Sequence, residues 1–477
     1  MKRRILIISC ILLAAVLLGG LLGWKHYQDT HYIYINDIRY SRSVTHLNLR
    51  SQTDPQLDAV CQLEYLEQLD LRNTGIDIED YNRLRAALPA CQILWDIPFQ
   101  GHFLDMNTTK LTVSALSDED LDALSFFPKL KEVDALECAD YELLHQLQTR
   151  YPDLSVFWQI TIGSEQFPGD TAALTAENPD TAQLELALKW LPDLQSIHLT
   201  GTLPDITWLT DTAAKYPQVK LTWEYEVCGR LFSSDAEEID LSDIPLENAD
   251  EVEAALTYFP SLTKVVMCNC GISNEDMDAL NRRYENIKFV WLIYIGKHPV
   301  RTDTIALMPW QFCSGVFDHD LKDLKYLTDL ICLDLGHQKV KDLSFLYYMP
   351  NMQYLMLADT PVSDATPIGS CKELKYLELF FTGIMDVSPL ANCTKLEDIN
   401  LSWMTILNLQ TLMELPNVQR FWLNNTDAPE EVVYALMRAM PNTTFSYVEL
   451  GDSVGFGWHQ SPNYYAQRDL LGMWYMD

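Results

Sequence analysis

Two acidic octapeptides, SDEDLDAL at 117–124 and SNEDMDAL at 273–280, resemble calcium-binding loops at first sight. An EF-hand loop alternates acidic ligands, has a central Gly and ends on a Glu at position twelve, and neither octapeptide fits that pattern. A Ser followed three residues later by an acid is instead typical of a capping box, and acids in a first turn suit the helix dipole. The pattern favours two helix N-termini over the alternative of calcium binding.

Eleven cysteines raise the question of disulfides, zinc and redox chemistry. No CxxC pair occurs, which argues against a zinc or thioredoxin-like site. Cys371 and Cys393 are 22 residues apart, as buried small residues at one position of a repeat would be. We expect reduced core cysteines. A bridge between these two is the alternative, because adjacent turns of a stacked repeat approach disulfide distance.

The sequence contains none of the common catalytic motifs. HExxH, the GxSxG elbow, the phosphate-binding GxxxxGK[ST] loop and the Rossmann glycine pattern are absent from it. Asp318-His319-Asp320 is the nearest polar cluster and is typical of a solvated loop. The sequence therefore predicts a protein that is not an enzyme and uses no cofactor or metal. A glycosidase needs only two carboxylates and no local motif, so an envelope hydrolase remains a minor alternative.

The strongest pattern is an L-x-L pair that recurs every 22 residues in the C-terminal third. The pairs are Leu333/Leu335, Leu355/Leu357, Leu377/Leu379, Ile399/Leu401 and Phe421/Leu423. Alternate residues of a strand point to opposite faces, so the pair points inward and the residues between and beside it point outward. No single turn can bury its apolar side alone, so the turns are expected to stack into a solenoid of parallel strands.

The pattern continues upstream with a longer period of about 65 residues. Trp95, Trp158, Trp223 and Trp291 are spaced by 63, 65 and 68 residues, and each is followed by a Gly five or six residues later. The segment GIDIEDYNRLRAALPACQILW (75–95) aligns without a gap with GISNEDMDALNRRYENIKFVW (271–291). We expect each unit to contain a strand, a turn, a helix and a second strand carrying the Trp. A further strand at the start of many units would make each one about three solenoid turns.

These repeats resemble the leucine-rich repeat in its 22-residue, internalin-like form. The segment LKYLELFFTGIMDVSPLANCTKLEDINLSWMTI (374–406) fits L-x-x-L-x-L-x-x-(N/T/C)-x-I. The longer units resemble those of membrane-anchored leucine-rich-repeat proteins of Clostridia-type bacteria. The resemblance covers roughly residues 44–477. It implies an α/β solenoid, a leucine-rich-repeat array of stacked short parallel strands with a helical or irregular convex side, after one N-terminal transmembrane helix.

The outward positions of the regular repeats supply the candidate binding residues. Stacking the turns should cluster aromatic and charged side chains on the concave face. The predicted ligand-binding residues are Tyr354, Met356, Tyr376, Glu378, Phe380, Asp398, Arg420 and Trp422. A solvent-facing aromatic patch rimmed by charge has the composition of an interaction hot spot. The alternative is that these rings pack against preceding loops or the C-terminal tail.

The last residues, 451–477, break the repeat and are rich in aromatic residues. They include Trp458, Tyr464, Tyr465, Trp474 and Tyr475. The last turn of a solenoid exposes apolar core and an unpaired strand edge. We therefore expect residues 447–477 to form a C-terminal cap, with an aromatic platform for a peptide or glycan as the alternative.

The N-terminus predicts a membrane anchor. Residues 5–23 are 19 apolar or small residues without a charge, and they follow Lys2-Arg3-Arg4. This length spans a hydrocarbon core, and the basic cluster favours residues 1–4 in the cytoplasm. A cleaved secretory signal is the alternative. The expected domains are then a juxtamembrane stalk and N-terminal cap at 24–43, irregular repeat units at 44–327, and regular repeats with a terminal unit at 328–446.

Composition limits the partners. The chain has 34 Lys and Arg against 67 Asp and Glu, a net charge of −33, and such a surface repels nucleic acids and anionic lipid headgroups. We expect a single-pass cell-membrane protein with an extracellular ectodomain. Its predicted function is non-catalytic recognition of an extracellular or envelope protein, peptide or glycan through the concave face. A structural scaffold of an envelope complex is the alternative, because a fold alone does not imply a function.

Overall fold

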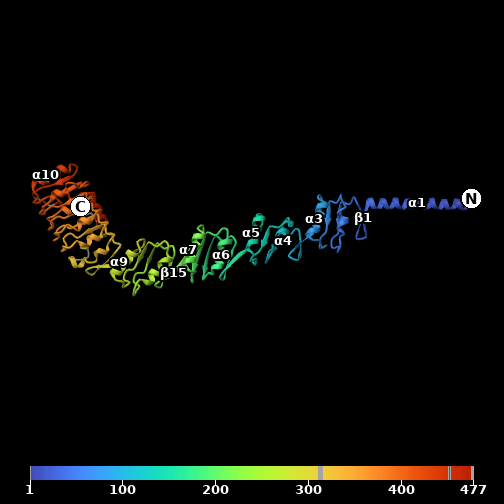
Figure 1. Ribbon diagram of the computed structural model, residues 1–477, viewed down its shortest axis with the longest axis horizontal. Helices are drawn as coiled ribbons and strands as arrows, with labels where there is room; N and C mark the ends of the chain where they lie inside the picture. The colour runs from blue at the N-terminus through green and yellow to red at the C-terminus, as the bar shows by residue number, and fades with distance from the viewer. Residues whose placement is uncertain (1, 310–314, 450, 452, 474–477) are drawn as a thin grey trace. The chain divides into compact units, whose positions relative to one another are not determined.

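The computed structural model describes residues 2–309, 315–449, 451 and 453–473, and for residues 2–11 it describes the backbone alone. The chain divides into two compact units, Met1–Trp223 (unit 1) and Glu224–Asp477 (unit 2). In both units short strands succeed one another along the chain with helices between them (Figure 1).

Unit 1 begins with helix α1 (Lys2–His31), followed by a hairpin of β1 (Tyr32–Ile35) and β2 (Ile38–Ser41). Asn36 and Asp37 at the turn both have left-handed backbone, with φ of 48° and 63°, as a two-residue hairpin of type I′ requires. Within the part of the chain whose side chains are described, no helix is long and apolar enough to cross a membrane. Residues 5–11 of the expected membrane span lie outside that part.

Unit 1 then repeats one arrangement, a set of three parallel strands followed by an antiparallel hairpin. The first set is β3 (His46–Asn48), β4 (Gln68–Asp70) and β5 (Gln92–Leu94), with hairpin β6 (Asp96–Phe99) and β7 (His102–Asp105). The second is β8 (Lys110–Thr112), β9 (Glu132–Asp134) and β10 (Ser155–Phe157), with hairpin β11 (Gln159–Ile162) and β12 (Glu165–Pro168). The third is β13 (Ala173–Glu177), β14 (Ser196–Thr200) and β15 (Lys220–Val227), and β15 continues past the unit boundary into a hairpin with β16 (Arg230–Ser233).

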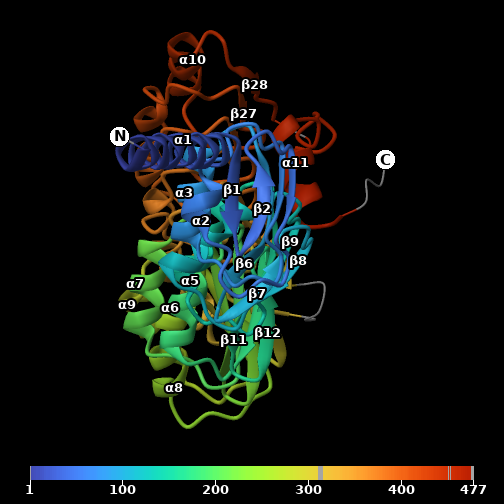
Figure 2. The same ribbon diagram turned by 90° about the vertical axis from the view of Figure 1, so that its right-hand side faces the viewer.

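The helices of unit 1 lie along one side of its strands (Figure 2). They are α2 (Leu57–Val60), α3 (Ile78–Ala87), α4 (Asp118–Ala123) with η1 (Leu124–Phe126), α5 (Tyr141–Arg150), α6 (Thr181–Trp190) and α7 (Ile206–Lys215). At the start of α4, the Asp120 N–H donates to Ser117 Oγ at 3.1 Å and the Ser117 N–H donates to the Asp120 carboxylate at 3.0 Å. The capping-box interpretation of this octapeptide is therefore confirmed.

Unit 2 opens with a fourth set of the same kind. Its parallel strands are β17 (Glu238–Asp240), β18 (Lys264–Val266) and β19 (Lys288–Val290), and its hairpin is β20 (Leu292–Ile295) and β21 (His298–Arg301). The helices of this set are α8 (Asp250–Ala255), η2 (Leu256–Tyr258) and α9 (Asn274–Arg283). Ser273 caps α9, because its Oγ accepts from the Asp276 N–H at 3.1 Å.

A parallel sheet of seven strands completes unit 2. The strands are β22 (Ala306–Leu307), β23 (Cys332–Asp334), β24 (Tyr354–Met356), β25 (Tyr376–Glu378), β26 (Asp398–Asn400), β27 (Arg420–Trp422) and β28 (Thr444–Ser446). The central residues of β23 to β27 are paired in register, and all are fully buried: Leu333, Leu355, Leu377, Ile399 and Phe421. The predicted 22-residue ladder is confirmed.

Short helices occupy the side of this sheet where the buried ladder packs. They are η4 (Asp318–Asp320), η5 (Leu324–Tyr326), η6 (Ser344–Tyr348), η7 (Ile368–Ser370), η8 (Ser388–Asn392), η9 (Leu409–Leu412) and α10 (Glu430–Ala439). The last helix, α11 (Pro462–Leu470), lies on the opposite side of β27 and β28 from α10 (Figure 2). Cys371 and Cys393 are buried and free, so the alternative of a bridge between them is not realised.

The three parallel strands of each set agree with the three solenoid turns expected for each unit, but the hairpins were not expected. The sequence predicted a single strand there, but the chain continues from each Trp into an antiparallel pair that separates one parallel set from the next. The turns use left-handed residues ending in Gly, as at Gln100-Gly101 (φ 49° and 77°) and Cys228-Gly229 (φ 51° and 76°). Each of Trp95, Trp158, Trp223 and Trp291 is buried at the base of its hairpin.

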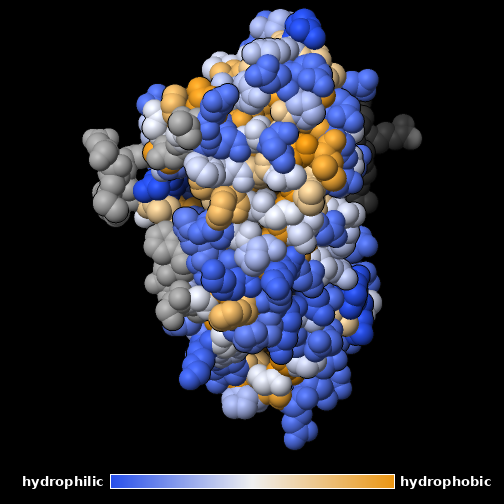
Figure 3. Space-filling model, turned by 90° about the vertical axis from the view of Figure 1, so that its left-hand side faces the viewer, coloured by the Kyte–Doolittle hydropathy of each residue, from blue (hydrophilic) through white to orange (hydrophobic). Residues whose placement is uncertain are grey.

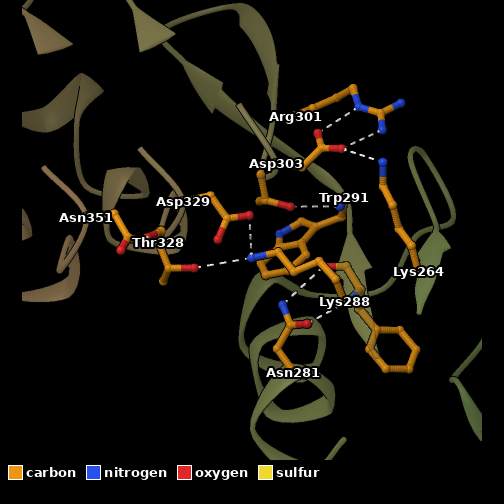
Figure 4. A network of polar contacts seen from close by, with 11 residues as sticks. Lys264, Asn281, Lys288, Trp291, Arg301, Asp303, Thr328, Asp329 and Asn351 are labelled. Carbon is orange, nitrogen blue, oxygen red and sulfur yellow. Dashed lines mark hydrogen bonds and ion pairs between the residues drawn. The ribbon is translucent and has the colours of Figure 1, made fainter. Parts of the chain in front are cut away.

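A polar network fixes hairpin β20–β21 to its neighbours within unit 2 (Figure 4). Asp303, just beyond β21, accepts from Arg301 Nε at 2.9 Å, from Arg301 Nη2 at 2.8 Å and from Lys264 Nζ at 2.9 Å. The Arg301 hydrogen bonds, aided by Lys264, hold the pKa of Asp303 well below its usual range. On the side of the regular repeats, Lys288 Nζ contacts Asp329 at 3.0 Å.

Candidate functional site

Two rows of outward-facing side chains cross the seven-stranded sheet. Because neighbouring strands are in register, equivalent residues lie side by side, about 4.8 Å apart from strand to strand. The first row is Cys332, Tyr354, Tyr376, Asp398, Arg420 and Thr444. The second row is Asp334, Met356, Glu378, Asn400, Trp422 and Ser446. Seven of the eight predicted binding residues belong to these rows, and Phe380 lies two residues beyond Glu378.

The C-terminal tail, residues 453–473, covers most of these residues. Trp458 is fully buried, with its ring centre 4.9 Å from that of Tyr376 and 5.6 Å from that of Trp422. Arg420 Nη1 donates to the Trp458 carbonyl at 3.0 Å, and Nη2 donates to the Gly457 carbonyl. The guanidinium also lies 4.4 Å from the Trp422 ring centre, a cation–π contact.

The expectation of a solvent-facing aromatic patch therefore needs correction for six of the eight residues. Five of them are less than one tenth exposed and Arg420 is half-buried; the five are Tyr354, Met356, Tyr376, Asp398 and Trp422. The physical reason is that the tail's own aromatic residues fill the concave face. The packing alternative describes these six positions. Trp474 and Tyr475 of the tail lie outside the described residues.

Asp398 shows how the covered part of the face is satisfied. Asn463 Nδ2, on α11, donates to the Asp398 carboxylate at 3.1 Å and to Glu397 at 2.9 Å. Burial raises the pKa of Asp398, while hydrogen bonds from Ser461 and Asn463 and the nearby Arg420 charge oppose that rise. A buried carboxylate with these partners holds the tail in place.

Beside the tail a cavity of about 600 Å³ stays open over β23 to β25. Its sheet side includes Asp334, Met356, Ala358, Glu378 and Phe380. Its tail side includes His459, Tyr464, Gln467, Arg468 and Leu471. The structure thus brings together three predicted residues, Met356, Glu378 and Phe380, in a hollow that the sequence analysis did not anticipate.

Glu378 is the most unusual group in this cavity. Tyr376 Oη donates to its carboxylate at 3.3 Å, and within the described part of the chain it forms no ion pair. Burial raises the pKa of Glu378 to about 7, and the negative charge of Asp334 adds to the rise. Burial also raises the pKa of Tyr376 well above its usual range.

Gln467 adds a second polar group from the tail. It lies on α11, is 4% exposed and contributes to the cavity wall. Within the described part of the chain its side-chain oxygen has no hydrogen-bond partner, although buried polar atoms usually have one. No sequence signal marked Gln467, because its role depends on where α11 docks.

The repeat spacing, the in-register parallel strands and the buried ladder define residues 306–446 as a leucine-rich-repeat solenoid. No family model and no curated protein matches the chain. Among solved structures, the chain is similar to an internalin from Listeria monocytogenes, with 14% identity over 87% of this chain and 91% of that chain and a TM-score of 0.25. Internalin C2 from the same organism has 20% identity over 33% and 79%, with a TM-score of 0.26. A leucine-rich-repeat protein of Leptospira interrogans has 14% identity over 85% and 96%, with a TM-score of 0.28. At these TM-scores the likenesses bear on no ligand or partner.

Proposed function

We propose that the protein is a non-catalytic recognition module that binds a segment of an extracellular or envelope protein in the concave cavity. The observation that carries the proposal is the cavity of about 600 Å³, which has a rigid sheet on one side and the tail on the other. This volume lies in the range of sites that enclose a ligand. The wall combines apolar side chains such as Met356 and Leu471 with a few polar ones, the composition that gives both affinity and orientation.

Capture of a partner from solubilised envelope tests this site, with the full chain in detergent as bait. Ala358→Trp places a large ring in the cavity and should abolish capture. Ala439→Trp is the matched control, because Ala439 is exposed at the end of α10, on the other side of the sheet (Figure 2). A partner held equally by wild type and by a folded Ala358→Trp variant would move recognition away from the cavity and towards the scaffold alternative.

One observation favours a second candidate, an envelope hydrolase. Two carboxylates, Asp334 and Glu378, line one cavity, and burial raises the pKa of Glu378 to about 7, as in a general acid of a glycosidase. Turnover of envelope glycan by wild type that disappears in Glu378→Gln would support this candidate. Capture of a partner without turnover would support recognition.

We further propose that residues 5–23 anchor the protein in the cell membrane, with residues 1–4 in the cytoplasm and the remainder outside. Eight large apolar side chains between Leu12 and Trp24 are each more than half exposed on α1, which in water is unfavourable. Fractionation tests this proposal: the full chain should sediment with membranes after an alkaline wash. A Leu17→Arg, Leu18→Arg variant should be released, and equal retention of both would contradict an anchor at this segment.

A further inference from the structure

Glu378 differs from the other enclosed carboxylates of unit 2. Asp303 has Arg301 and Lys264 within hydrogen-bond distance, and Asp398 has Asn463 and the nearby Arg420 charge. Among the described residues, Glu378 forms no ion pair and is approached by two neutral groups, the Tyr376 hydroxyl at 3.3 Å and the Trp458 indole. An enclosed carboxylate without a positive partner costs stability unless a cation reaches it from outside.

A second carboxylate faces the same space. Asp334, Met356 and Glu378 are register partners on β23, β24 and β25, so the Cα atoms of the two acids are about 10 Å apart by ordinary strand spacing. The Met356 side chain lies between them on the cavity wall. Two like charges at this range repel each other, and one cation between them would be attracted by both.

The tail supplies an independent acceptor. The Gln467 side-chain oxygen has no partner among the described residues, and Gln467 is more than nine tenths buried in the cavity wall. A hydrogen-bond donor on a ligand in the cavity would satisfy this amide oxygen. Acceptors therefore converge from the sheet and from α11.

The remaining polar groups of the wall restrict where a cation fits. Arg468 Nη1 donates to Tyr464 Oη at 3.1 Å, and His337 Nδ1 lies 3.1 Å from the Asp359 carboxylate. The Tyr464 ring stacks on His459 with centres 4.2 Å apart. The positive Arg468 is thus on the tail side beside Tyr464, and the acids are on the sheet side.

From these observations we infer that the cavity binds an organic cation, an alkylammonium or guanidinium group, seated on the sheet side against Glu378 and Asp334 and hydrogen-bonded to Gln467. Both groups are donors only, so they match a wall of acceptors. The inference rests on the proposed function, because it takes the cavity as the binding site. The group belongs either to a free amine or guanidine or to a Lys or Arg side chain of a peptide.

Calorimetric titration of the full chain in detergent at pH 8, above the Glu378 pKa of about 7, tests the inference. The probes are butylammonium, butylguanidinium, the capped peptide Ac-Gly-Lys-Gly-Lys-Gly-NH2 and its glutamate counterpart Ac-Gly-Glu-Gly-Glu-Gly-NH2. We expect at least one cationic probe to bind and the glutamate peptide not to bind. Binding of the small cations alone would assign a free ligand, and binding of the lysine peptide alone would assign a side chain.

Charge-neutralising variants test which carboxylates contact the bound cation. Glu378→Gln should weaken binding of the cationic probe about tenfold or more, the usual size of a lost charge-assisted hydrogen bond. Asp334→Asn should also weaken it, while the fold is kept because Asn retains an oxygen for the Gly336 N–H that donates to Asp334 at 2.9 Å. Glu373→Gln is the control for net charge, because Glu373 is paired with Lys395 away from the cavity. Circular dichroism checks that each variant is folded.

Three results would overturn the inference: no binding of any cationic probe, equal binding by wild type and Glu378→Gln, or preferred binding of the glutamate peptide. These failures are separable from failure of the proposed function. If Ala358→Trp abolishes partner capture but no cation binds, the site stands and its ligand class is wrong. If cations bind through Glu378 but Ala358→Trp captures the partner normally, the cation site stands and the proposed function is wrong.

Discussion

Glu378 is a residue at which stability and binding are expected to conflict. Burial raises its pKa from 4.5 to about 7, so between these pH values the folded protein keeps a proton that the unfolded chain has lost. The free energy of unfolding therefore falls as pH rises from about 4.5 to about 7 and stays reduced above that window. Below pH 4.5 the Glu378 carboxyl is protonated in both the folded and the unfolded chain, so it adds no pH dependence to the free energy of unfolding.

Glu378→Gln should remove this pH-dependent loss. The free energy of unfolding of the variant minus that of wild type should increase by about 1–3 kcal/mol from pH 5 to pH 8, the size expected for a pKa shift of this kind. Thermal unfolding of both proteins at the two pH values measures the gain, with Glu373→Gln as control. A wild-type-to-variant difference that is independent of pH would contradict the burial of the Glu378 carboxylate.

Phe381 is a second residue whose local preference is not met. It has a left-handed backbone, φ 55°, and its ring is half exposed. The equivalent positions of the other turns also have positive φ: His337, Asp359, Trp403 and Asn425. Short polar residues such as Asp and Asn tolerate this conformation far better than an aromatic residue does.

Phe381→Asn should therefore raise the free energy of unfolding by about 1 kcal/mol. Chemical denaturation measures the change. A loss of stability would show that the ring's edge contact with Trp403, 6.4 Å between centres, outweighs the backbone strain.

At the scale of elements, the tail and the repeats are stabilised separately. The buried ladder from Leu333 to Phe421 does not include the tail, whereas Trp458 belongs to a separate apolar cluster with Tyr376 and Trp422. Loss of a buried Trp side chain costs about 3–5 kcal/mol. For Trp458 we expect this loss to reduce the free energy that holds the tail on the sheet.

Trp458→Ala should therefore release the tail while the repeats stay folded. The expected results are rapid protease cleavage within residues 453–473 and an unchanged far-ultraviolet spectrum of the remainder. The control is Tyr347→Ala, because Tyr347 is more than half exposed on η6, away from the tail. Equal protection of the tail in wild type and Trp458→Ala would contradict the role of Trp458 as the residue that holds it.

Asp303, beside hairpin β20–β21, should make stability depend on pH in the opposite direction to Glu378. Its pKa is lowered by Arg301 and Lys264, so its contribution to stability is complete above the unfolded pKa of about 3.9 and is lost as pH falls towards the lower folded pKa. Asp303→Asn should cost about 1–3 kcal/mol at pH 7, and the difference from wild type should shrink at pH 3. A cost that stays constant at both pH values would contradict the ion-pair account.

The predictability of these elements differs for physical reasons. The strands β23 to β27 could be predicted because each must bury a ladder residue such as Leu355 against the next turn. The hairpins were missed, although the two-residue turn ending in Gly101 or Gly229 is a short-range signal for them. The position of Trp458 between Tyr376 and Trp422 depends on contacts between residues far apart in sequence. Local patterns therefore favoured an exposed patch over packing, and the cavity beside Trp458 could not be foreseen.

At the scale of the whole molecule, charge and polarity set the kind of partner. The chain carries a net charge of −33, and hydrophilic side chains predominate on the face of the molecule in Figure 3, with apolar patches between them. A field of this sign increases the association rate of cationic partners and slows anionic ones. The repeats then supply rigidity, because the in-register ladder fixes the spacing of the rows that line the cavity.

Site-specific photo-crosslinking tests the central claim, that recognition takes place in the concave cavity, most directly. The photoreactive residue p-benzoylphenylalanine would replace either Phe380, in the cavity wall, or Tyr347, exposed on η6, in the full chain mixed with solubilised envelope. We predict a crosslinked partner from position 380 that is absent from position 347 and absent when Ala358→Trp is added. A partner crosslinked from position 347 alone would contradict it and place recognition on the opposite side of the repeats.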